Sequence, residues 1–534
     1  MYSQYKKHIA AAAITTIGLV AFDFAVPQIN KKIINYQKDI NQDVHRRSDF
    51  QPLKDLKQKF KDIFFDFYNI QGIQYKGYFL GYASDNYWID GAGYQISEKI
   101  FKNLIKATHE LHNLCLEATN IAIKDDYLLT KVFDIPEDMI PLIRNSWENK
   151  QIDLLSRYDF ILDKKGQLYF LEVNGDTPSC IIEAGPAQKI WAEQFQLFQF
   201  NNIDTEIKQG LQKIMEKNGK SQLYILDNQS LEDQSTFNYL NYLINPFLTN
   251  VTIKKDNISK IDQIIENELN LDNFKSSIIL KQYPFEWLAS QSTHKFFVNP
   301  QFYNNNSQIM IEPPWKIIMS NKAMSVLLYS MFPQNPHLAK ASLEPIRHGC
   351  MGIPQVSKQK NGREGHSIIF SKSFDDFGIF IQNTYQKYLQ KPIFQEFVDS
   401  YQHQRRYITL SCWVIQGKPC GIVIREDLNP IIGAGSSVVP YYIKKDVENY
   451  QPIQIDLITD NEQSNIRQQI YGKEVFNSNT NLIRIQEKIT KKTQFIDPYF
   501  KQNLIIQSKR TQQLLEKNQD QQVDYLGISH HYTG

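Results

Sequence analysis

The most regular alternation of apolar and polar positions lies between residues 157 and 174. Two apolar-rich runs, 157–162 and 167–174, flank the sequence Asp163-Lys164-Lys165-Gly166. These four residues have the composition of a turn, and each flanking run has the length and alternation of a strand. The pattern therefore predicts a β-hairpin closed by a four-residue loop.

The expected register of this hairpin gathers its polar side chains. A four-residue loop would set Arg157 opposite Glu172, with Leu162 opposite the first residue of the returning run. Residues two apart share a face of a strand, so Asp159 would lie beside Arg157, and Asn174 beside Glu172. Cross-strand neighbours are close enough to touch, and the four side chains are expected to form one patch.

Oxygen donors dominate this patch. Asp159 and Glu172 supply carboxylates and Asn174 supplies an amide oxygen, which suits Mg²⁺, a hard cation that also accepts phosphate oxygens. Thr177 followed by Pro178 is typical of a helix N-cap and first helical position, and a helix N-terminus beside a metal would seat an anion. The alternative, from spacing alone, is an ordinary hairpin with a structural ion pair.

A helical period follows Ser97, which is suited to cap a long helix. The apolar positions that recur every three or four residues are Ile100, Leu104, Ala107, Leu111, Leu114, Cys115 and Ala118. Further along, apolar runs at 223–226 and 278–280 alternate with polar helical stretches. These patterns together predict an α/β protein.

A glycine-rich loop lies between residues 358 and 367. A short strand ending at Lys358 is followed by Gly362 and Gly365, and a return strand is expected over Ser367–Phe370. Glycines let the backbone approach phosphate oxygens, and Lys358 supplies positive charge. The order of residues differs from a Walker loop, so the pattern alone indicates phosphate binding of another type.

Composition narrows the class of protein. Among 534 residues, 59 are basic and 57 acidic, a net charge of +2 that gives no reason to expect a nucleic-acid partner. Hydrophobic residues make up 42% of the chain, enough for a large core in two to four domains or one large catalytic unit. The five cysteines are odd in number and lack paired metal spacing, so we expect mostly reduced core thiols.

Both ends of the chain differ from its centre. Residues 9–22 are uncharged and apolar, and the run reaches residue 26 if Asp23 is tolerated, close to the ~20 residues that a span needs. A signal or anchor segment, an organellar targeting segment and a helix buried on a partner are all compatible with it. Residues 9–26 thus predict membrane association, with the mitochondrion as one candidate location and the cytoplasm as the alternative. Residues 444–534, rich in Gln, Asn and Lys, predict a partly ordered or partner-binding extension.

Several motif blocks resemble the glutathionylspermidine synthase family. They are SRYDF and LEVNGDTPSCIIEAG around the hairpin, YPFEW at 283–287, IEPPWKIIMSNKAMSVLLYSMFP from Ile311, KQKNGREG from Lys358, PIFQEFV from Pro392 and GIVIRED from Gly421. The blocks follow the family's order across residues 53–443, with residues 1–52 as an added apolar segment and linker. Gln359 departs from the proline that the family usually has, and residues 432–437 replace a Thr- or Asn-rich loop.

The resemblance implies an ATP-grasp fold, in which the nucleotide is held between two α+β subdomains, with ATP and Mg²⁺ as cofactors. The implied metal ligands are Asp159, Glu172 and Asn174. The implied nucleotide contacts are Lys322, Lys358, Gly362, Arg363, Gly365, Gln395 and Glu396. The implied catalytic residues are Arg157 and Arg425, which would stabilise charge on the transferred phosphoryl group. The implied seat of a peptide carboxylate comprises Asp176, Thr177 and Ser179.

One lysine assignment has a rival. Lys322 directly precedes an expected helix at residues 323–331, where ATP-grasp enzymes place a phosphate-binding lysine. Lys316 is the other candidate, and an isolated lysine on a helix is usually solvated. We expect Lys322 to be the phosphate ligand.

Two functions from different classes are consistent with these patterns. The first is an ATP-dependent carbon–nitrogen ligase that joins a peptide carboxylate to an amine through an acyl phosphate, with glutathione and spermidine suggested by the family. The second is a non-catalytic subunit of a membrane-bound complex, suggested by the two added ends. The complete set of charged motif residues favours the ligase.

Overall fold

A computed structural model describes the chain over most of its central part. The described residues are 43–51, 87–89, 91–218, 222–227, 231–244, 252–257, 277–291, 294–303, 309–349, 351–363, 365, 367–371, 377, 380–381, 383–384, 391–433 and 436–444. The apolar segment 9–26, the helix expected at 53–68 and almost all of the extension 444–534 lie outside them. The predicted domain boundaries at 52 and 443 therefore remain predictions.

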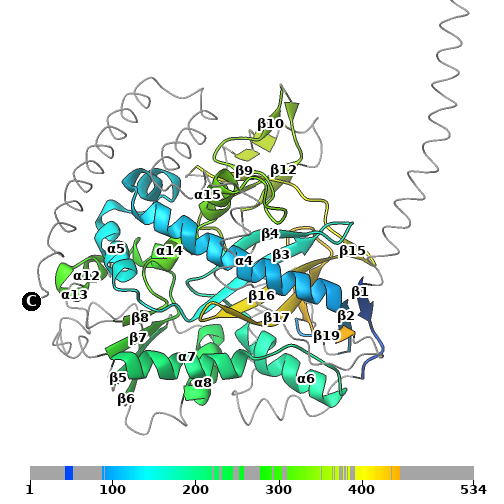
Figure 1. Cartoon of the computed structure of the whole chain (residues 1–534), viewed down its shortest axis with the longest axis horizontal. Helices are drawn as coiled ribbons and strands as arrows, with labels where there is room; N and C mark the ends of the chain where they lie inside the picture. Colours follow the sequence, from blue (N-terminus) through cyan, green and yellow to red (C-terminus); the bar gives the residue numbers. More distant parts are fainter. Residues whose placement is uncertain are drawn as a thin grey trace, which may run out of the picture.

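An antiparallel sheet forms the centre of the molecule (Figure 1). Its strands lie in the order β18-β17-β16-β3-β4, and β15 pairs with the outer part of β16. They are β3 (Leu155–Leu162), β4 (Leu168–Asn174), β15 (Gln402–His403), β16 (Arg406–Ile415), β17 (Lys418–Asp427) and β18 (Ser437–Val439). The predicted hairpin is β3 and β4, and its pairing with β16 places it beside strands more than 200 residues away in sequence.

One long helix, α4 (Glu98–Ile123), crosses a face of this sheet (Figure 1). Ser97 caps it as expected, accepting a hydrogen bond from the backbone N–H of Ile100 at 3.3 Å. All seven predicted apolar positions of the helix are buried, in one core cluster with Leu410 and Cys412 of β16. Burial of this stripe accounts for the helix and fixes which face of the sheet is covered.

A second, smaller antiparallel sheet carries the glycine-rich loop. Its strands lie in the order β13-β12-β14-β9, with bounds β9 (Ala341–Ser342), β12 (Gln355–Lys358), β13 (Ile369–Ser371) and β14 (Ile393–Glu396). The predicted return strand begins two residues later than expected. Ser367 has φ of 61°, a left-handed conformation that extended strands do not adopt, so it belongs to the loop.

A parallel sheet with helices forms a third layer. The strands lie in the order β6-β5-β7-β8, with bounds β5 (Gln222–Asp227), β6 (Thr252–Asn257), β7 (Ser277–Lys281) and β8 (Ile309–Ile311). Helices α7 (Ile203–Asn218) and α8 (Leu231–Ile244) lie beside it (Figure 1). Both apolar runs that predicted an α/β layer are strands of this sheet.

The remaining elements are short. Strands β1 (Val44–Arg47), β2 (Gly93–Ser97) and β19 (Tyr441–Lys444) form a three-stranded sheet that joins the two ends of the described chain. The others are η1 (Leu128–Val132), η2 (Glu137–Met139), α5 (Ile140–Glu148), η3 (Glu183–Ala187), α6 (Gln188–Gln194), α11 (Phe285–Leu288), α12 (His294–Phe297), α13 (Pro300–Tyr303), α14 (Lys316–Ser320), α15 (Ala323–Met331), β10 (Arg347–His348) and β11 (Met351–Gly352).

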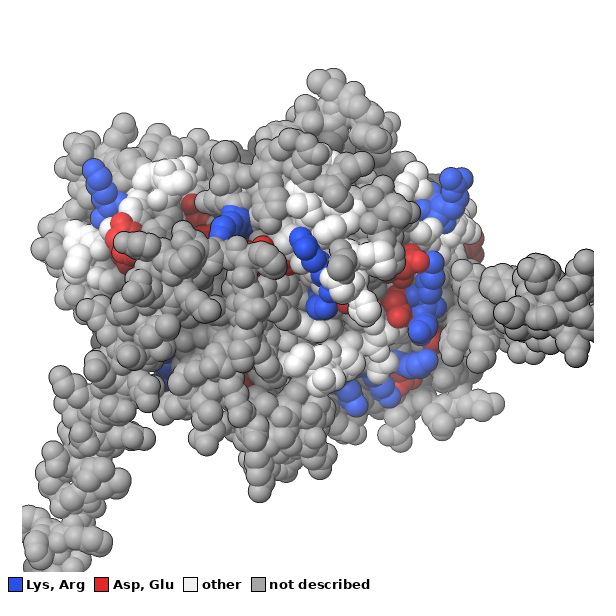
Figure 2. Space-filling view, turned by 90° about the horizontal axis from the view of Figure 1, so that it is seen from above, with Lys and Arg blue, Asp and Glu red and all other residues white. Residues whose placement is uncertain are grey.

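Helices and sheets are therefore layered as the α/β prediction required. On the face shown in Figure 2, basic and acidic side chains of the described residues are interspersed, in keeping with the nearly balanced charge. Within the described ranges, no helix is both long and apolar enough to cross a bilayer.

Candidate active site

The hairpin register differs from the expected one, and a β-bulge in it brings Asp159 opposite Glu172. Leu162 pairs with Leu168, one residue further along than predicted, and Arg157 pairs with Asn174 and not with Glu172. A β-bulge lies between these pairs and leaves Leu171 as the extra residue on β4. Without the bulge, Asp159 would pair with Leu171. With it, Asp159 faces Glu172, and the predicted patch forms in spite of the wrong register.

The central sheet has two unlike faces. Tyr158 points toward α4, where its hydroxyl lies 3.0 Å from His112 Nδ1. Arg157 and Asp159 point to the opposite face, together with Glu172 and Asn174. The polar patch is thus on the face that α4 leaves uncovered.

Arg157 and Asp159 form a two-pronged ion pair. Nε and Nη2 of Arg157 donate to the two carboxylate oxygens of Asp159 at 2.8 and 2.9 Å, and both side chains are buried. Burial disfavours the charged guanidinium, but Asp159 outweighs it and raises the pKa of Arg157. Asp159 also accepts from Asn174 at 3.1 Å, and Arg425 approaches it at 3.5 Å. Asp159 therefore lies at the centre of the patch.

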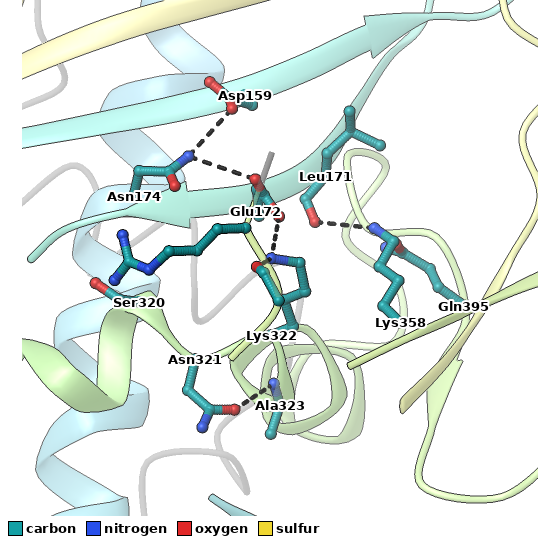
Figure 3. A network of polar contacts seen from close by, with 12 residues as sticks. Asp159, Leu171, Glu172, Asn174, Ser320, Asn321, Lys322, Ala323, Lys358 and Gln395 are labelled. Carbon is teal, nitrogen blue, oxygen red and sulfur yellow. Dashed lines mark hydrogen bonds and ion pairs between the residues drawn. The ribbon is translucent and has the colours of Figure 1, made fainter. Parts of the chain in front are cut away.

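Glu172 is the second carboxylate (Figure 3). Its Oε2 lies 2.8 Å from Nζ of Lys322, and its Oε1 lies 3.5 Å from the amide of Asn174. Burial alone would raise the pKa of Glu172, but Lys322 and Lys358 outweigh it and lower the pKa to about 2. Glu172 is accordingly ionised at neutral pH.

Lys358 reaches the same patch from the second sheet. Its Nζ donates to Oε1 of Gln395 at 2.7 Å and to the backbone carbonyl of Leu171, the bulged residue, at 3.5 Å (Figure 3). Burial lowers the pKa of Lys358 to about 8, and nearby Glu172 opposes that change only in part. Contacts with both sheets make Lys358 a link between them.

A pocket of about 940 Å³, partly open to solvent, lies between the two sheets at this point. One end is charged and is lined by Asp159, Glu172, Lys322, Lys358 and Arg425. The other end is mainly apolar and is lined by Ile161, Tyr169, Val356, Ile368, Phe397 and Val398. A nucleotide has the same division of polarity, because its flat base suits the apolar end and its phosphate chain suits the charged end.

The remaining nucleotide candidates also meet at this pocket. Gly362, Gly365, Gln395 and Glu396 line it, as expected from the resemblance. Gly365 has φ of 70°, and a Cβ there would lie 2.9 Å from the backbone oxygen of Ile432. Only glycine fits this conformation and this approach, so Gly365 holds the loop against the segment after β17.

Arg363 lies elsewhere than the resemblance implied. It is absent from the lining of the large pocket and lines an adjoining, smaller cavity with Thr177 and Glu286. There it donates to Glu286 Oε1 at 2.6 and 2.8 Å and to the Thr177 hydroxyl at 2.9 Å. The two cavities share Lys322 and Gly362, so they are neighbours around one loop.

Thr177 is not a helix N-cap. Residues 174–180 contain no helix, and the helical segment begins at Ile181, after Cys180 in a left-handed conformation with φ of 69°. The prediction failed because the left-handed residue Cys180 separates Thr177 and Pro178 from the helical segment, so neither can take the cap or first helical position. The Thr177 hydroxyl instead faces Arg363 in the smaller cavity.

Asp176 and Ser179 have partners within the protein. Asp176 forms a buried ion pair with Lys281 and accepts a hydrogen bond from the backbone N–H of Phe285 at 2.8 Å. Ser179 is exposed, and its carbonyl accepts from Nη1 of Arg157 at 2.7 Å. Asp176 therefore has a structural partner and also lines the smaller cavity with Thr177, and Ser179 lies at the edge of the charged patch.

Lys316 is not solvated, and it does not line the large pocket. Its side chain is fully buried, and Nζ lies 2.7 Å from Glu312 and 2.6 Å from the carbonyl oxygen of Leu155. Glu312 in turn accepts from the backbone N–H groups of Leu154 and Leu155 at 2.9 and 2.7 Å. This pair fixes the start of β3, and Lys322 remains the lysine of this segment that enters the pocket.

Two acidic residues were missed by sequence reasoning. Glu286 belongs to the YPFEW block, to which no chemistry was assigned, although an acid between aromatic residues was a usable signal. Glu183 is buried beneath the hairpin end and accepts from the Tyr87 hydroxyl at 2.5 Å. Burial raises the pKa of Glu183 despite this hydrogen bond.

The donor set fits Mg²⁺ when phosphate accompanies it. The amide nitrogen of Asn174 donates to the carboxylates of Asp159 and Glu172 at 3.1 and 3.5 Å, so the three side chains meet at one point. The cationic side chains around them (Arg157, Lys322, Lys358 and Arg425) outnumber the two carboxylates by two. A bare cation would add to this excess, whereas a nucleotide triphosphate with its Mg²⁺ would offset it.

Comparison of the sequence with known proteins identifies the family to which this chain belongs. A model of the glutathionylspermidine synthase preATP-grasp family matches residues 47–444. A Haemophilus influenzae protein named "Putative acid–amine ligase" is 27% identical over 417 residues, covering 74% of this chain and 99% of that protein. The bifunctional glutathionylspermidine synthetase/amidase of Escherichia coli is 26% identical over 372 residues, covering 66% of this chain and 59% of that protein.

Among solved structures, a glutathione synthetase-like effector of Globodera pallida is similar to 74% of this chain, with 11% identity and a TM-score of 0.43. The family assignment rests on the sequence match, which covers well over half of the chain. The chain therefore belongs to the glutathionylspermidine synthase preATP-grasp family and is a ligase with the ATP-grasp fold.

Proposed function

We propose that this chain joins a peptide carboxylate to an amine at the expense of ATP, through an acyl phosphate. The main observation behind this proposal is the charge of the patch, in which four cationic side chains surround the carboxylates of Asp159 and Glu172. The patch lies at one end of a pocket whose other end is mainly apolar. The relatives that match it include a glutathionylspermidine synthetase and a trypanothione synthetase. Glutathione and spermidine are the substrates with which we would begin.

Asp159, Glu172 and Asn174 would hold Mg²⁺, which would supply positive charge beside the phosphate chain. Lys322, Lys358 and Arg425 bind the phosphate chain around it. Arg425 is oriented for this, because its Nε is buried and has no hydrogen-bond partner among the described residues. Phosphoryl transfer depends mainly on such positioning and charge neutralisation.

In this reaction the peptide carboxylate would lie next to Arg157. Its guanidinium faces the backbone carbonyl and hydroxyl of Ser179 at 2.7 and 3.2 Å, at the edge of the patch. A carboxylate at this edge would lie beside the phosphate-binding cations. Its attack on the γ-phosphorus of ATP would break the bond to ADP and form an acyl phosphate, from which the deprotonated amine would displace phosphate to leave the amide. Arg157 and Arg425 then offset the negative charge that develops on the reacting group.

The smaller cavity is the proposed acceptor site. An aliphatic amine is cationic at neutral pH and needs a carboxylate nearby. Asp176 and Glu286 both line the cavity, but Asp176 is buried and paired with Lys281, whereas the side chain of Glu286 is 15% exposed. Glu286 is therefore the acidic group that an amine would approach, and Arg363 occupies it in this structure.

The loop that carries Gly362 and Gly365 would limit the entry of water. Lys322 donates to the carbonyl of Gly362, and Arg363 joins the same loop to Thr177 and Glu286. These contacts attach the loop to both cavities. Excluding water protects an acyl phosphate from hydrolysis before the amine attacks.

Calorimetric titration of MgATP into the full chain tests the first step. We expect saturable binding that requires Mg²⁺ and is lost in the Asp159→Asn, Glu172→Gln double variant. Glu148→Gln, an exposed residue on α5, serves as the matched control and should bind as the unmodified chain does.

Turnover is tested next by following the release of ADP and phosphate with glutathione and spermidine present together. Dependence on both substrates supports the proposal. Binding of MgATP without release in the presence of any peptide and amine tested would reject the ligation reaction for this site. The predicted accessory-subunit role rests on the two end segments, which lie outside the described residues.

A further inference from the structure

Strand β16 places two hydroxyl groups on the same face as the charged patch. Ser411 pairs with Asp159 on β3, and Thr409 pairs with Arg425 on β17. Paired residues share a face, so both hydroxyl-bearing side chains lie on the side opposite α4. Thr409 lines the nucleotide pocket directly.

Neither hydroxyl has a hydrogen-bond partner among the residues that the structure describes. Thr409 is 1% exposed and Ser411 is fully buried, yet within the described part of the chain their hydroxyl oxygens have no hydrogen-bond partner. The Nε of Arg425, across the strand from Thr409, is in the same condition. Buried polar groups without partners are costly and uncommon, so a group of them facing one pocket indicates a ligand that is polar at this position.

The direction of these groups separates them from other buried hydroxyls. Ser156 of β3 also has no partner among the described residues, but it pairs with Val414 on the face that packs against α4. Thr409 lines the nucleotide pocket and Ser411 pairs with Asp159, which lines it, whereas Ser156 has neither relation to the pocket. The inference therefore rests on three features together, namely burial, absence of a partner and position on the pocket face.

We infer that Thr409 and Ser411 complete the phosphate site. The Thr409 hydroxyl, beside Arg425, donates to a terminal phosphate oxygen of the nucleotide. Ser411, next to Asp159, is a positioning residue that holds a water molecule bound to the cation. This inference rests on the proposed function, since it needs a nucleotide in this pocket, and it extends it to two uncharged residues that no motif marks.

The chemistry suits both roles. Phosphate oxygens only accept hydrogen bonds and a hydroxyl can donate one, whereas a metal-bound water donates and a hydroxyl can accept. Mg²⁺ usually keeps several waters when it binds through one or two carboxylates, so groups that hold those waters are needed around Asp159. Uncharged hydroxyls supply these contacts without changing the charge balance of the patch.

The test compares stability and nucleotide affinity in the full chain. Thr409→Val removes the hydroxyl and keeps the shape, and Thr409→Ser restores the hydroxyl. We expect Thr409→Val to bind MgATP roughly ten- to a hundredfold more weakly by calorimetry, as for loss of a hydrogen bond to a charged group, and Thr409→Ser to stay within about threefold. Without nucleotide, Thr409→Val should melt at the same temperature or about 1–3 °C higher, because a costly buried group is gone.

If the Thr409 hydroxyl had only a structural role, its removal would lower the melting temperature and leave the affinity for MgATP unchanged. A lower melting temperature for nucleotide-free Thr409→Val, together with unchanged MgATP affinity, would overturn the inference. If the valine variant fails to fold, Thr409→Ala gives the same comparison of affinities.

Ser411→Ala separates the second role, because its loss should mainly raise the Mg²⁺ concentration needed for half-maximal nucleotide binding, by about three- to tenfold. An unchanged Mg²⁺ requirement would remove Ser411 from the site. If the unmodified chain binds no MgATP, the proposed function fails together with the inference. If it binds MgATP and Thr409→Val binds equally well, the inference alone fails.

Discussion

Two clusters of lysines and carboxylates adjoin each other in this protein but differ in what surrounds them. In the sealed cluster, Lys281 pairs with Asp176 and Lys316 with Glu312, and both lysine side chains are fully buried. In the open cluster, Lys322 pairs with Glu172, whose side chain is 25% exposed at the pocket. The residue types are the same, and only the second cluster meets a cavity large enough for a nucleotide.

The clusters also differ in charge balance. Each sealed lysine has its own carboxylate, so neutrality is reached inside the protein. In the open cluster, two lysines and two arginines surround two carboxylates. Glu183 is a further buried carboxyl group near both arginines, but burial raises its pKa and so disfavours its charged form. Unbalanced charge disfavours the folded state and is retained where a ligand offsets it. Excess charge beside a cavity, and not the number of ionisable groups, therefore distinguishes a binding site from a structural ion pair.

The largest expected effect comes from neutralising one residue of the open cluster. Lys358→Met should lower turnover at least 10²- to 10³-fold, the usual cost of removing one group that stabilises transition-state charge, while the fold persists. Steady-state release of ADP measures turnover, and circular dichroism checks the fold. Lys213→Met, an exposed lysine on α7, is the control and should be fully active. Turnover within a few fold of the unmodified chain would remove Lys358 from the site.

Neutralising one residue of the sealed cluster should affect stability instead. Lys281→Met leaves Asp176 buried without its partner and should lower the free energy of unfolding by about 3–5 kcal/mol, measured with urea. Adding Asp176→Asn removes the buried charge, keeps an acceptor for the N–H of Phe285 and should restore much of the loss. Turnover per folded molecule should stay near that of the unmodified chain. A selective loss of turnover would place this pair in the active site.

The sequence predicted the open cluster better than the sealed one, for a physical reason. Strand alternation placed Asp159, Glu172 and Asn174 on one face, and local pattern is sufficient for that. The bulge at Leu171 was not foreseen, because it interrupts an apolar run without any change in composition. The assumed loop was one residue too short, which shifted the predicted pairing by one residue, and the bulge shifted it by one more. Two shifts restore the same face, so the predicted patch formed although the predicted residue pairs were wrong.

The misplaced residues are those whose environment depends on distant segments. Asp176 lines the smaller cavity as well, but its ion pair with Lys281, 105 residues away in sequence, cannot be inferred from local pattern. Lys316 was expected in solvent, but it packs against β3 through Leu155. Arg363 was expected at the nucleotide because its loop lines the large pocket, but its side chain points to Glu286 in the smaller cavity. Layer architecture follows from periodicity, whereas burial of single polar residues requires the assembled fold.

A smaller effect should appear in the pH dependence of nucleotide binding. Burial holds the pKa of Lys358 at about 8, so the lysine is cationic below that pH and neutral above it. MgATP affinity should therefore be greatest below pH 8 and fall as pH rises, by up to tenfold per unit. Calorimetry in buffers of different ionisation enthalpy should show proton uptake on binding near pH 8. Lys358→Arg stays charged and should flatten the profile, and an affinity independent of pH from 7 to 9.5 in the unmodified chain would contradict the assignment.

The smallest effect concerns the pH dependence of stability, to which one glutamate of each cluster should contribute with opposite sign. Burial alone would raise the pKa of Glu172, but Lys322 and Lys358 lower it from 4.5 to about 2. Glu172 therefore stabilises the fold above pH 4.5, and this stability is lost as pH falls toward 2. Burial raises the pKa of Glu312 from 4.5 to about 7, so Glu312 makes the fold less stable as pH rises from 4.5 to 7.

Melting temperatures of the nucleotide-free chain between pH 3 and 8 measure both contributions. One proton per molecule changes stability by at most about 1.4 kcal/mol per pH unit, or about 2 °C per unit in a protein of this size. Glu172→Gln should reduce the loss of stability on the acid side, and Glu312→Gln should reduce the loss between pH 4.5 and 7. If both variants change the profile in the same pH range, the two clusters share one electrostatic environment, and the distinction between a sealed and an open cluster does not hold.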